Sequence, residues 1–201
     1  MKNLFRMDNP VMQALEVAAD LMALNLLTLV CSLAIFTIGP AVTALHVCVI
    51  RLVRAEDGNL LRDYFTAFRS NFKKGCLLGL LLLGAAGLLW LDYRAALVYA
   101  PPLRYGIAAL ALLLLALAQY AFALLARYEN TLPHTLKNAA ALAVGYFPRT
   151  AGMLGFLLAF WLLAARFYAI GVPLLFLFGL SLPGYVDALL LQPVFQKLEG
   201  E

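Results

Sequence analysis

Hydrophobic residues are gathered into long uncharged stretches, and the charged residues lie almost entirely between them. The four long stretches without a formal charge are Leu21–Ile50, Gly75–Leu91, Tyr105–Ala126 and Thr150–Ala165. An α-helix rises about 1.5 Å per residue, so roughly 20 apolar residues cross a hydrocarbon core about 30 Å thick. The pattern predicts an all-α protein, a polytopic bundle of transmembrane helices.

Turn signals divide the chain into about five spans of a single membrane domain, residues 1–201. Gly39-Pro40 is expected to end or kink the first span, because proline lacks an N–H and clashes with the preceding turn. Pro101-Pro102 and Gly171-Val172-Pro173 mark two later turns. The expected spans are residues 17–38, 75–96, 103–128, 149–169 and 173–191.

Three more helices are expected on the cytoplasmic side, at about residues 41–53, 60–74 and 132–147. The first of these has about 13 residues, which is too short to span a membrane. We interpret it as a continuation beyond a kink or as a helix packed at the cytoplasmic side. The alternative is that it crosses the membrane again.

Residues 60–74 have the periodicity of an amphipathic helix that begins after Asp57-Gly58-Asn59, a turn with a good N-cap. Such a helix rests on lipid or on its own bundle, or it docks to a partner. The aromatic and basic residues of the candidate docking face are Tyr64, Phe65, Phe68, Arg69, Phe72, Lys73 and Lys74.

The composition leaves little room for a soluble domain. Hydrophobic residues make up 64% of the chain and charged residues 13%, whereas soluble domains have about 25% charged residues. The basic excess lies in short loops beside apolar spans, where it orients the protein, so we expect no nucleic-acid partner. With five spans, ten Lys and Arg residues lie on the side of the two larger loops and five on the other. This distribution predicts a cytoplasmic C-terminus and an external N-terminus, or a cytoplasmic N-terminus if residues 41–53 cross again.

Motifs for chemistry are absent from the sequence. It contains no phosphate-binding loop, no zinc-protease motif and no hydrolase nucleophile motif, and its three cysteines and two histidines lack metal-ligand spacing. We therefore expect no enzyme activity, no cofactor and no metal site.

Polar residues inside or at the ends of the predicted spans are the remaining candidates for function. Buried ionisable groups are costly in a membrane and often mark solute or proton pathways, although an interhelical hydrogen bond or ion pair is the commoner explanation. These candidates are Asp187, Gln119, Asn25, Glu16 and Asp20. Gly75 and Gly79 have the spacing that lets two helix backbones approach closely, so we expect both at a helix–helix contact.

Two segments carry a resemblance to a known family. Gly39-Pro40-Ala41 and the block from Asp63 to Lys74, with Tyr64-Phe65, Phe68-Arg69 and Asn71-Phe72-Lys73, resemble the YesL-like family of bacterial integral membrane proteins of unknown function. That family is often encoded beside sugar-uptake ABC transporters and glycan-degradation genes. The resemblance implies the bacterial cytoplasmic membrane, a role in carbohydrate utilisation, and an ABC sugar transporter or another membrane protein as a candidate partner besides the lipid bilayer.

Two functions fit these expectations. One is a small accessory or regulatory protein of a transport or envelope process. The alternative is a small secondary transporter with a polar pathway near Asp187. A water-accessible cavity lined by Asp187 and Gln119, or by Glu16 and Asp20, would favour transport. A dry bundle with an exposed aromatic and basic cytoplasmic face would favour the accessory role.

Overall fold

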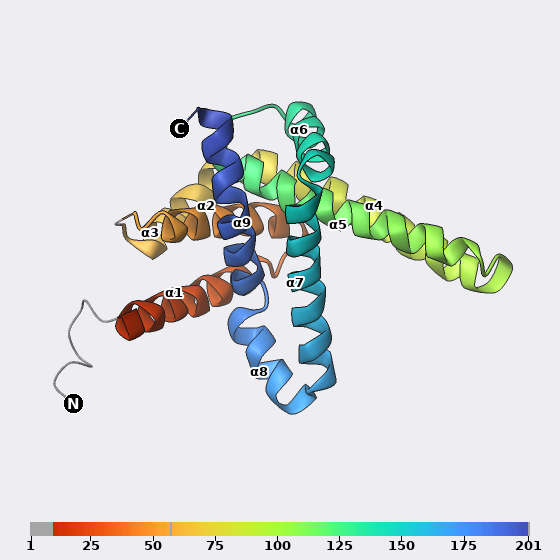
Figure 1. The fold of residues 1–201 in the computed structure, drawn as a ribbon, viewed down its shortest axis with the longest axis horizontal. Helices are drawn as coiled ribbons and strands as arrows, with labels where there is room; N and C mark the ends of the chain where they lie inside the picture. The colour runs from red at the N-terminus through yellow and green to blue at the C-terminus, as the bar shows by residue number, and fades with distance from the viewer. Residues whose placement is uncertain (1–9, 57, 201) are drawn as a thin grey trace.

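The computed structural model describes residues 10–56 and 58–200, and these fold into helices joined by short connections (Figure 1). The prediction of an all-α fold is confirmed. The elements in chain order are α1 (Pro10–Cys31), the 3₁₀ helix η1 (Ile35–Thr37), α2 (Ile38–Val53), α3 (Leu60–Ser70), α4 (Phe72–Tyr99), α5 (Leu103–Arg127), α6 (Leu132–Gly145), α7 (Phe147–Arg166), α8 (Tyr168–Phe178) and α9 (Ser181–Glu199).

Several helices of the described chain are long and apolar enough to cross a membrane. Five meet this criterion singly, and a sixth span results if the bent pair α8–α9 is counted as one. The five single candidates are Met12–Cys31, Ile35–Val53, Phe72–Tyr99, Leu103–Arg127 and Phe147–Arg166. This is the composition of a multi-pass helical membrane protein.

The break after the first span does not lie where the sequence placed it. Helix α1 ends at Cys31, and Gly39-Pro40 falls in the first turn of α2. Proline is tolerated there, because an N–H in the first turn has no partner within the helix in any case. This corrects the predicted kink at Gly39-Pro40. It also extends the predicted short helix 41–53 to a 19-residue candidate span, Ile35–Val53.

Helices α1 and α2 form an antiparallel hairpin (Figure 1). Glu16 and Asp20 in the first half of α1 line the same cavity as Cys48 and Arg51 in the second half of α2. The chain therefore returns to the side from which α1 started. This arrangement corresponds to the alternative in which the segment crosses the membrane again.

The predicted last span, 173–191, is also corrected, because it is divided between two helices. Helix α8 ends at Phe178 and α9 begins at Ser181, with an angle of 59° between them. A Cβ atom at Gly179 would collide with the carbonyl group of Leu175, so the bend requires a glycine. The two helices therefore meet at a corner and do not form one straight helix.

The core consists of two groups of buried side chains that meet around α2. One group, which includes Leu24, Leu45 and Tyr64, joins α1, α2 and α3. The other, which includes Tyr120 and Phe195, joins α4, α5, α6, α7 and α9. From this centre the α4–α5 hairpin projects in one direction and the α7–α8 hairpin in another (Figure 1).

Glycines bring the backbones of α2 and α4 into direct contact. A Cβ atom at Gly75 would lie 2.8 Å from the Cα of Pro40, and one at Gly79 would lie 2.7 Å from the Cα of Gly39. Both distances are too short for non-bonded carbon atoms. The structure thus places Gly75 and Gly79 at a helix–helix crossing of the close-approach type, in which dispersion forces between backbones hold the helices together.

Replacing Gly79 with alanine is expected to separate α2 from α4. Because the opposing atoms belong to the backbone of Gly39, they cannot move aside as a flexible side chain would, and a destabilisation of about 1–3 kcal/mol is expected. Thermal unfolding in detergent measures the effect. Gly84→Ala is the matched control, since no atom lies within 4 Å of a Cβ at that position of the same helix. Equal melting temperatures for the two variants would contradict the contact.

The hairpin of α1 and α2 changes the predicted topology. If both cross the membrane, Lys2 and Arg6 join the basic residues of the cytoplasmic side. Of the fifteen Lys and Arg residues, Arg94, Arg104 and Arg166 then remain outside. The basic residues are then divided more unevenly between the two sides of the membrane than ten against five. Crossing one flat bilayer requires the α4–α5 and α7–α8 hairpins to lie closer to parallel than they do in Figure 1.

We therefore predict that both termini are cytoplasmic. Alkaline phosphatase, which is active only outside the cytoplasm, should be active when fused near Pro101 and inactive when fused at either end of the chain. A fluorescent protein fused at the same points should give the opposite pattern. An active phosphatase at the N-terminus would instead support the five-span arrangement.

Candidate functional site

Asn25 on α1 holds the corner between α8 and α9. Its amide nitrogen donates a hydrogen bond to the carbonyl oxygen of Phe176 at 2.7 Å. Its amide oxygen accepts hydrogen bonds from the backbone N–H groups of Leu180 at 2.8 Å and Ser181 at 3.1 Å. These groups lie at the end of one helix and the start of the next, where backbone groups have no partner within the helix. Asn25 therefore replaces the water that such groups would bind outside a membrane.

Asp187 and Gln119 contact each other in the interior. The amide nitrogen of Gln119 on α5 lies 3.2 Å and 3.1 Å from the two carboxyl oxygens of Asp187 on α9. The exposed fractions are 4% for Asp187 and 8% for Gln119. Two of the sequence-predicted residues, 68 positions apart, are thus one hydrogen-bonded pair. Neither residue lines the polar cavity or the apolar groove described below.

Two buried oxygen atoms near these residues have no hydrogen-bond partner among the described residues. One is the amide oxygen of Gln119, and the other is the hydroxyl oxygen of Ser181, beside the Asn25 clamp. Unpaired buried polar atoms are uncommon in proteins, and strain, a chemical role or a bound water or ion accounts for them. Sequence analysis missed Ser181, because serine is a common residue type at the first positions of a helix.

His46 is a further interior residue that sequence analysis did not select. It lies on α2, is 6% exposed and stacks against Phe122 of α5, with ring centroids 6.4 Å apart. Gly184 of α9, one turn from Asp187, faces the same imidazole ring. Within residues 10–56 and 58–200, no group of three or more His, Cys, Asp or Glu side chains is placed to hold a metal ion.

Glu16 and Asp20 line a polar cavity of about 650 Å³ between α1, α2 and the start of α3. Arg51 lies across from them and forms ion pairs with Asp63 at 2.8 Å and Glu56 at 3.2 Å. The cavity is open and lies at the end of the bundle that carries the 54–59 connection. Arg51, Glu56 and Asp63 form an ion-pair network, and Glu16 and Asp20 line the same cavity without an ion pair to Arg51 among those found in the described residues. This cavity is separate from the Asp187–Gln119 pair.

The candidate docking face divides into a buried part and an exposed part. Tyr64 is fully buried, which corrects its assignment to an accessible surface. Its hydroxyl group lies 3.3 Å from both the carbonyl oxygen of Ala41 and the hydroxyl oxygen of Thr28. Burial raises the pKa of Tyr64, so its hydroxyl group remains a neutral donor. Tyr64 therefore anchors α3 to the α1–α2 hairpin.

The rest of that face has mixed accessibility. Phe68 and Phe72 are partly buried and pack edge to face, with ring centroids 5.6 Å apart. Phe65 is 44% exposed. The basic residues Arg69, Lys73 and Lys74 are exposed. The accessible face is consequently narrower than predicted and more basic than aromatic.

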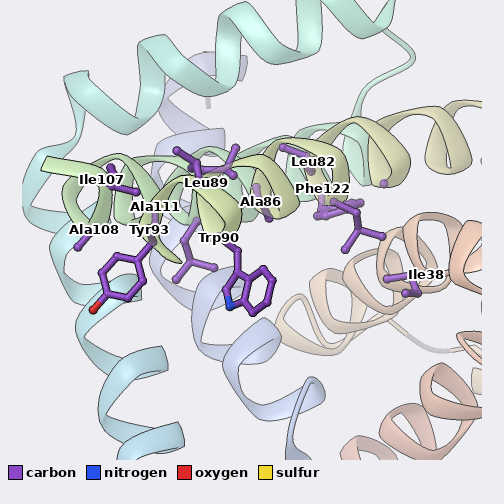
Figure 2. A pocket seen from close by; sticks show the side chains of 15 residues that line it. Ile38, Leu82, Ala86, Leu89, Trp90, Tyr93, Ile107, Ala108, Ala111 and Phe122 are labelled. Carbon is purple, nitrogen blue, oxygen red and sulfur yellow. The ribbon is translucent and has the colours of Figure 1, made fainter. Parts of the chain in front are cut away.

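An apolar groove of about 430 Å³ runs between α4 and α5 (Figure 2). It begins near Ile38 and Gly79 at the α2–α4 crossing and extends to Trp90, Tyr93 and Ile107 near the outer turn of the hairpin. Sequence analysis did not predict this groove, because both helices are apolar around most of their circumference.

Comparison with known proteins gives a family match for part of the chain. Residues 21–93 match the family described as "Protein of unknown function, DUF624". The matched segment runs from the middle of α1 through most of α4, so it includes Asn25, the α2–α4 crossing and the whole of α3. No curated protein and no solved structure matches the chain.

Replacing Asn25 with leucine is expected to release the corner between α8 and α9. Two backbone N–H groups and one carbonyl group would lose their partner in the interior, at a total cost of about 2–4 kcal/mol. Thermal unfolding in detergent should show a clearly lower melting temperature. Leu26→Ala is the control, because Leu26 is 37% exposed on the same helix. Equal melting temperatures would show that the clamp contributes nothing to stability.

Proposed function

We propose that this chain is a YesL-like, non-enzymatic accessory or regulatory protein of a transport or envelope process in the bacterial cytoplasmic membrane. The observation that carries the proposal is the use of its intramembrane polar residues. Asn25 caps two helix ends, and Asp187 and Gln119 are buried against each other. These contacts join helices, and none of them lines a water-accessible pathway among the cavities described above.

The surface of α3 supports an interaction with a partner protein. Phe65 and Arg69 lie one turn apart on the exposed side of the helix, and Lys73 follows at the start of α4. An aromatic side chain beside exposed basic groups suits an acidic, partly apolar surface on a partner. The link to carbohydrate utilisation, with an ABC sugar transporter as the candidate partner, rests on the resemblance to the YesL-like family alone, because the family matched over residues 21–93 has no known function.

A second candidate function is a small secondary transporter with its pathway near Asp187. The bend between α8 and α9 supports it, because interrupted membrane helices commonly form the substrate and ion sites of transporters. The unpaired oxygen atoms of Gln119 and Ser181 lie along the same part of the bundle. A third class, the enzymes, has no support from any residue arrangement described above.

The accessory function is tested by isolating the tagged protein from native membranes and identifying what is bound. We expect one membrane partner to be captured by the wild type and lost by the double variant Phe65→Ser, Arg69→Gln. Lys137→Gln is the control, since Lys137 is an exposed basic residue of another predicted cytoplasmic helix, α6. Equal capture by all three proteins would contradict the docking face.

Asp187→Asn separates the two candidate functions in the same experiment. An asparagine still forms a hydrogen bond with Gln119 but cannot exchange a proton or bind a cation as a carboxylate does. The accessory function predicts normal abundance, partner capture and growth on the relevant sugar. Normal abundance together with lost growth would favour the transporter.

A further inference from the structure

The groove between α4 and α5 has the dimensions of a hydrocarbon chain. From Gly79 to Tyr93 the α4 side covers about 21 Å, at 1.5 Å per residue. Aliphatic side chains and alanines make up most of its wall, and the small residues Ala86, Ala108 and Ala111 leave the space open. The ring of Tyr93 stands at the outer end, and the ring of Trp90 lies about one helical turn before it (Figure 2).

Two arginines lie at that outer end. The guanidinium carbon of Arg94 is 5.7 Å from the centre of the Trp90 ring, which itself lines the groove. Arg104 precedes the groove residue Ala108 by one helical turn, and its guanidinium group donates a hydrogen bond of 2.7 Å to the hydroxyl group of Tyr105. The apolar groove thus ends beside two cationic groups.

Neither arginine has an anionic partner within the part of the chain that the structure describes. The ion pairs found there all involve Arg51 or Arg54, which lie at the C-terminal end of α2. Asp92 is the acidic residue nearest in sequence to Arg94, but side chains two positions apart on a helix point to different faces. Within the described residues, these two positive charges therefore contact aromatic rings and no carboxylate. Tryptophan, tyrosine and arginine are residue types that anchor helices at a membrane interface.

We propose that this groove binds one anionic phospholipid, with an acyl chain along the groove and the phosphate group between Arg94 and Arg104. The apolar wall suits the chain, and guanidinium groups bind phosphate oxygens with two parallel hydrogen bonds. The site is independent of the proposed accessory function.

A second copy of this chain fits the groove less well. A two-fold axis along the membrane normal would place the arginines of both copies at the same depth, where like charges repel. A phospholipid supplies the negative charge that the outer end lacks. It also fills the groove with a single flexible chain, which needs no matching surface.

The test measures thermal unfolding of the purified full-length protein in mild detergent with added phosphatidylglycerol or phosphatidylcholine. Native mass spectrometry counts the bound lipids. We expect one retained phosphatidylglycerol per chain and a larger rise in melting temperature with phosphatidylglycerol than with phosphatidylcholine. The double variant Arg94→Gln, Arg104→Gln should lose this difference while keeping its fold, because Arg94 is exposed and Arg104 is partly exposed.

A second variant tests the acyl-chain part of the site. Ala111→Phe fills the groove and should abolish retention of the lipid. Ala109→Phe, on the same helix but outside the groove, should leave it unchanged. Equal effects of the two lipids, unchanged retention in Ala111→Phe, an equal rise with inorganic phosphate alone, or a dimer in place of a lipid adduct would each overturn the proposal.

Discussion

The contact of the α2 backbone with the α4 backbone is the constraint on which the rest of the fold depends. Lipid is as apolar as a leucine side chain, so membrane helices gain little from burying hydrocarbon and associate through close packing instead. Gly39 and Pro40 meet Gly75 and Gly79 with no side chain between them. This crossing sets α2 in the centre, where it also packs against α1, α3, α5 and α9. Both halves of the contact lie in the segment that matches the family, residues 21–93.

Hydrogen bonds between distant parts of the chain then define how the other helices are arranged. Asn25 bonds to α8 and α9, Gln119 to Asp187, and Tyr120 on α5 to Thr150 on α7 at 3.0 Å. Such bonds contribute only about 0.6 kcal/mol each on average in membrane proteins. Their greater effect is on specificity, because a helix that slides or rotates leaves a polar group in contact with hydrocarbon, where it finds no partner. The glycine contact holds the helices close, and the polar contacts select one alignment among the close ones.

Hydropathy together with proline and glycine turn signals predicted the helical fold and the approximate positions of α4, α5, α6 and α7. It failed at Gly39-Pro40, because the same dipeptide is compatible with a kink and with the first turn of a new helix. What distinguishes the two is the position of Gly75 and Gly79 opposite Gly39, which is a tertiary contact. The bend after Phe178 was missed for a similar reason, since the backbone groups left free at the bend bond to a side chain about 150 residues earlier in the chain.

The candidate polar residues were identified singly, and their pairing was not predictable. Asp187 and Gln119 were selected because each is polar within an apolar stretch, but the sequence carries no record of which polar group faces which. Helical periodicity likewise placed Tyr64 beside Phe65 on one stripe. The structure separates them, because α1 and α2 cover Tyr64 and leave Phe65 exposed. The accessibility of each side chain on α3 therefore depends on α1 and α2, which the periodicity of residues 60–74 does not describe.

The Asn25 clamp also has a consequence for how the protein is made. The partner groups of Asn25 follow it by as many as 156 residues. At roughly 5–20 residues per second, a ribosome needs on the order of 8–30 s to synthesise that length. During this interval α1 and α2 are already available for insertion, and the amide group of Asn25 has not yet met α8 or α9. The nascent chain must therefore shelter a polar side chain for many seconds, by contact with the insertion machinery, with water, or with a temporary partner inside the membrane.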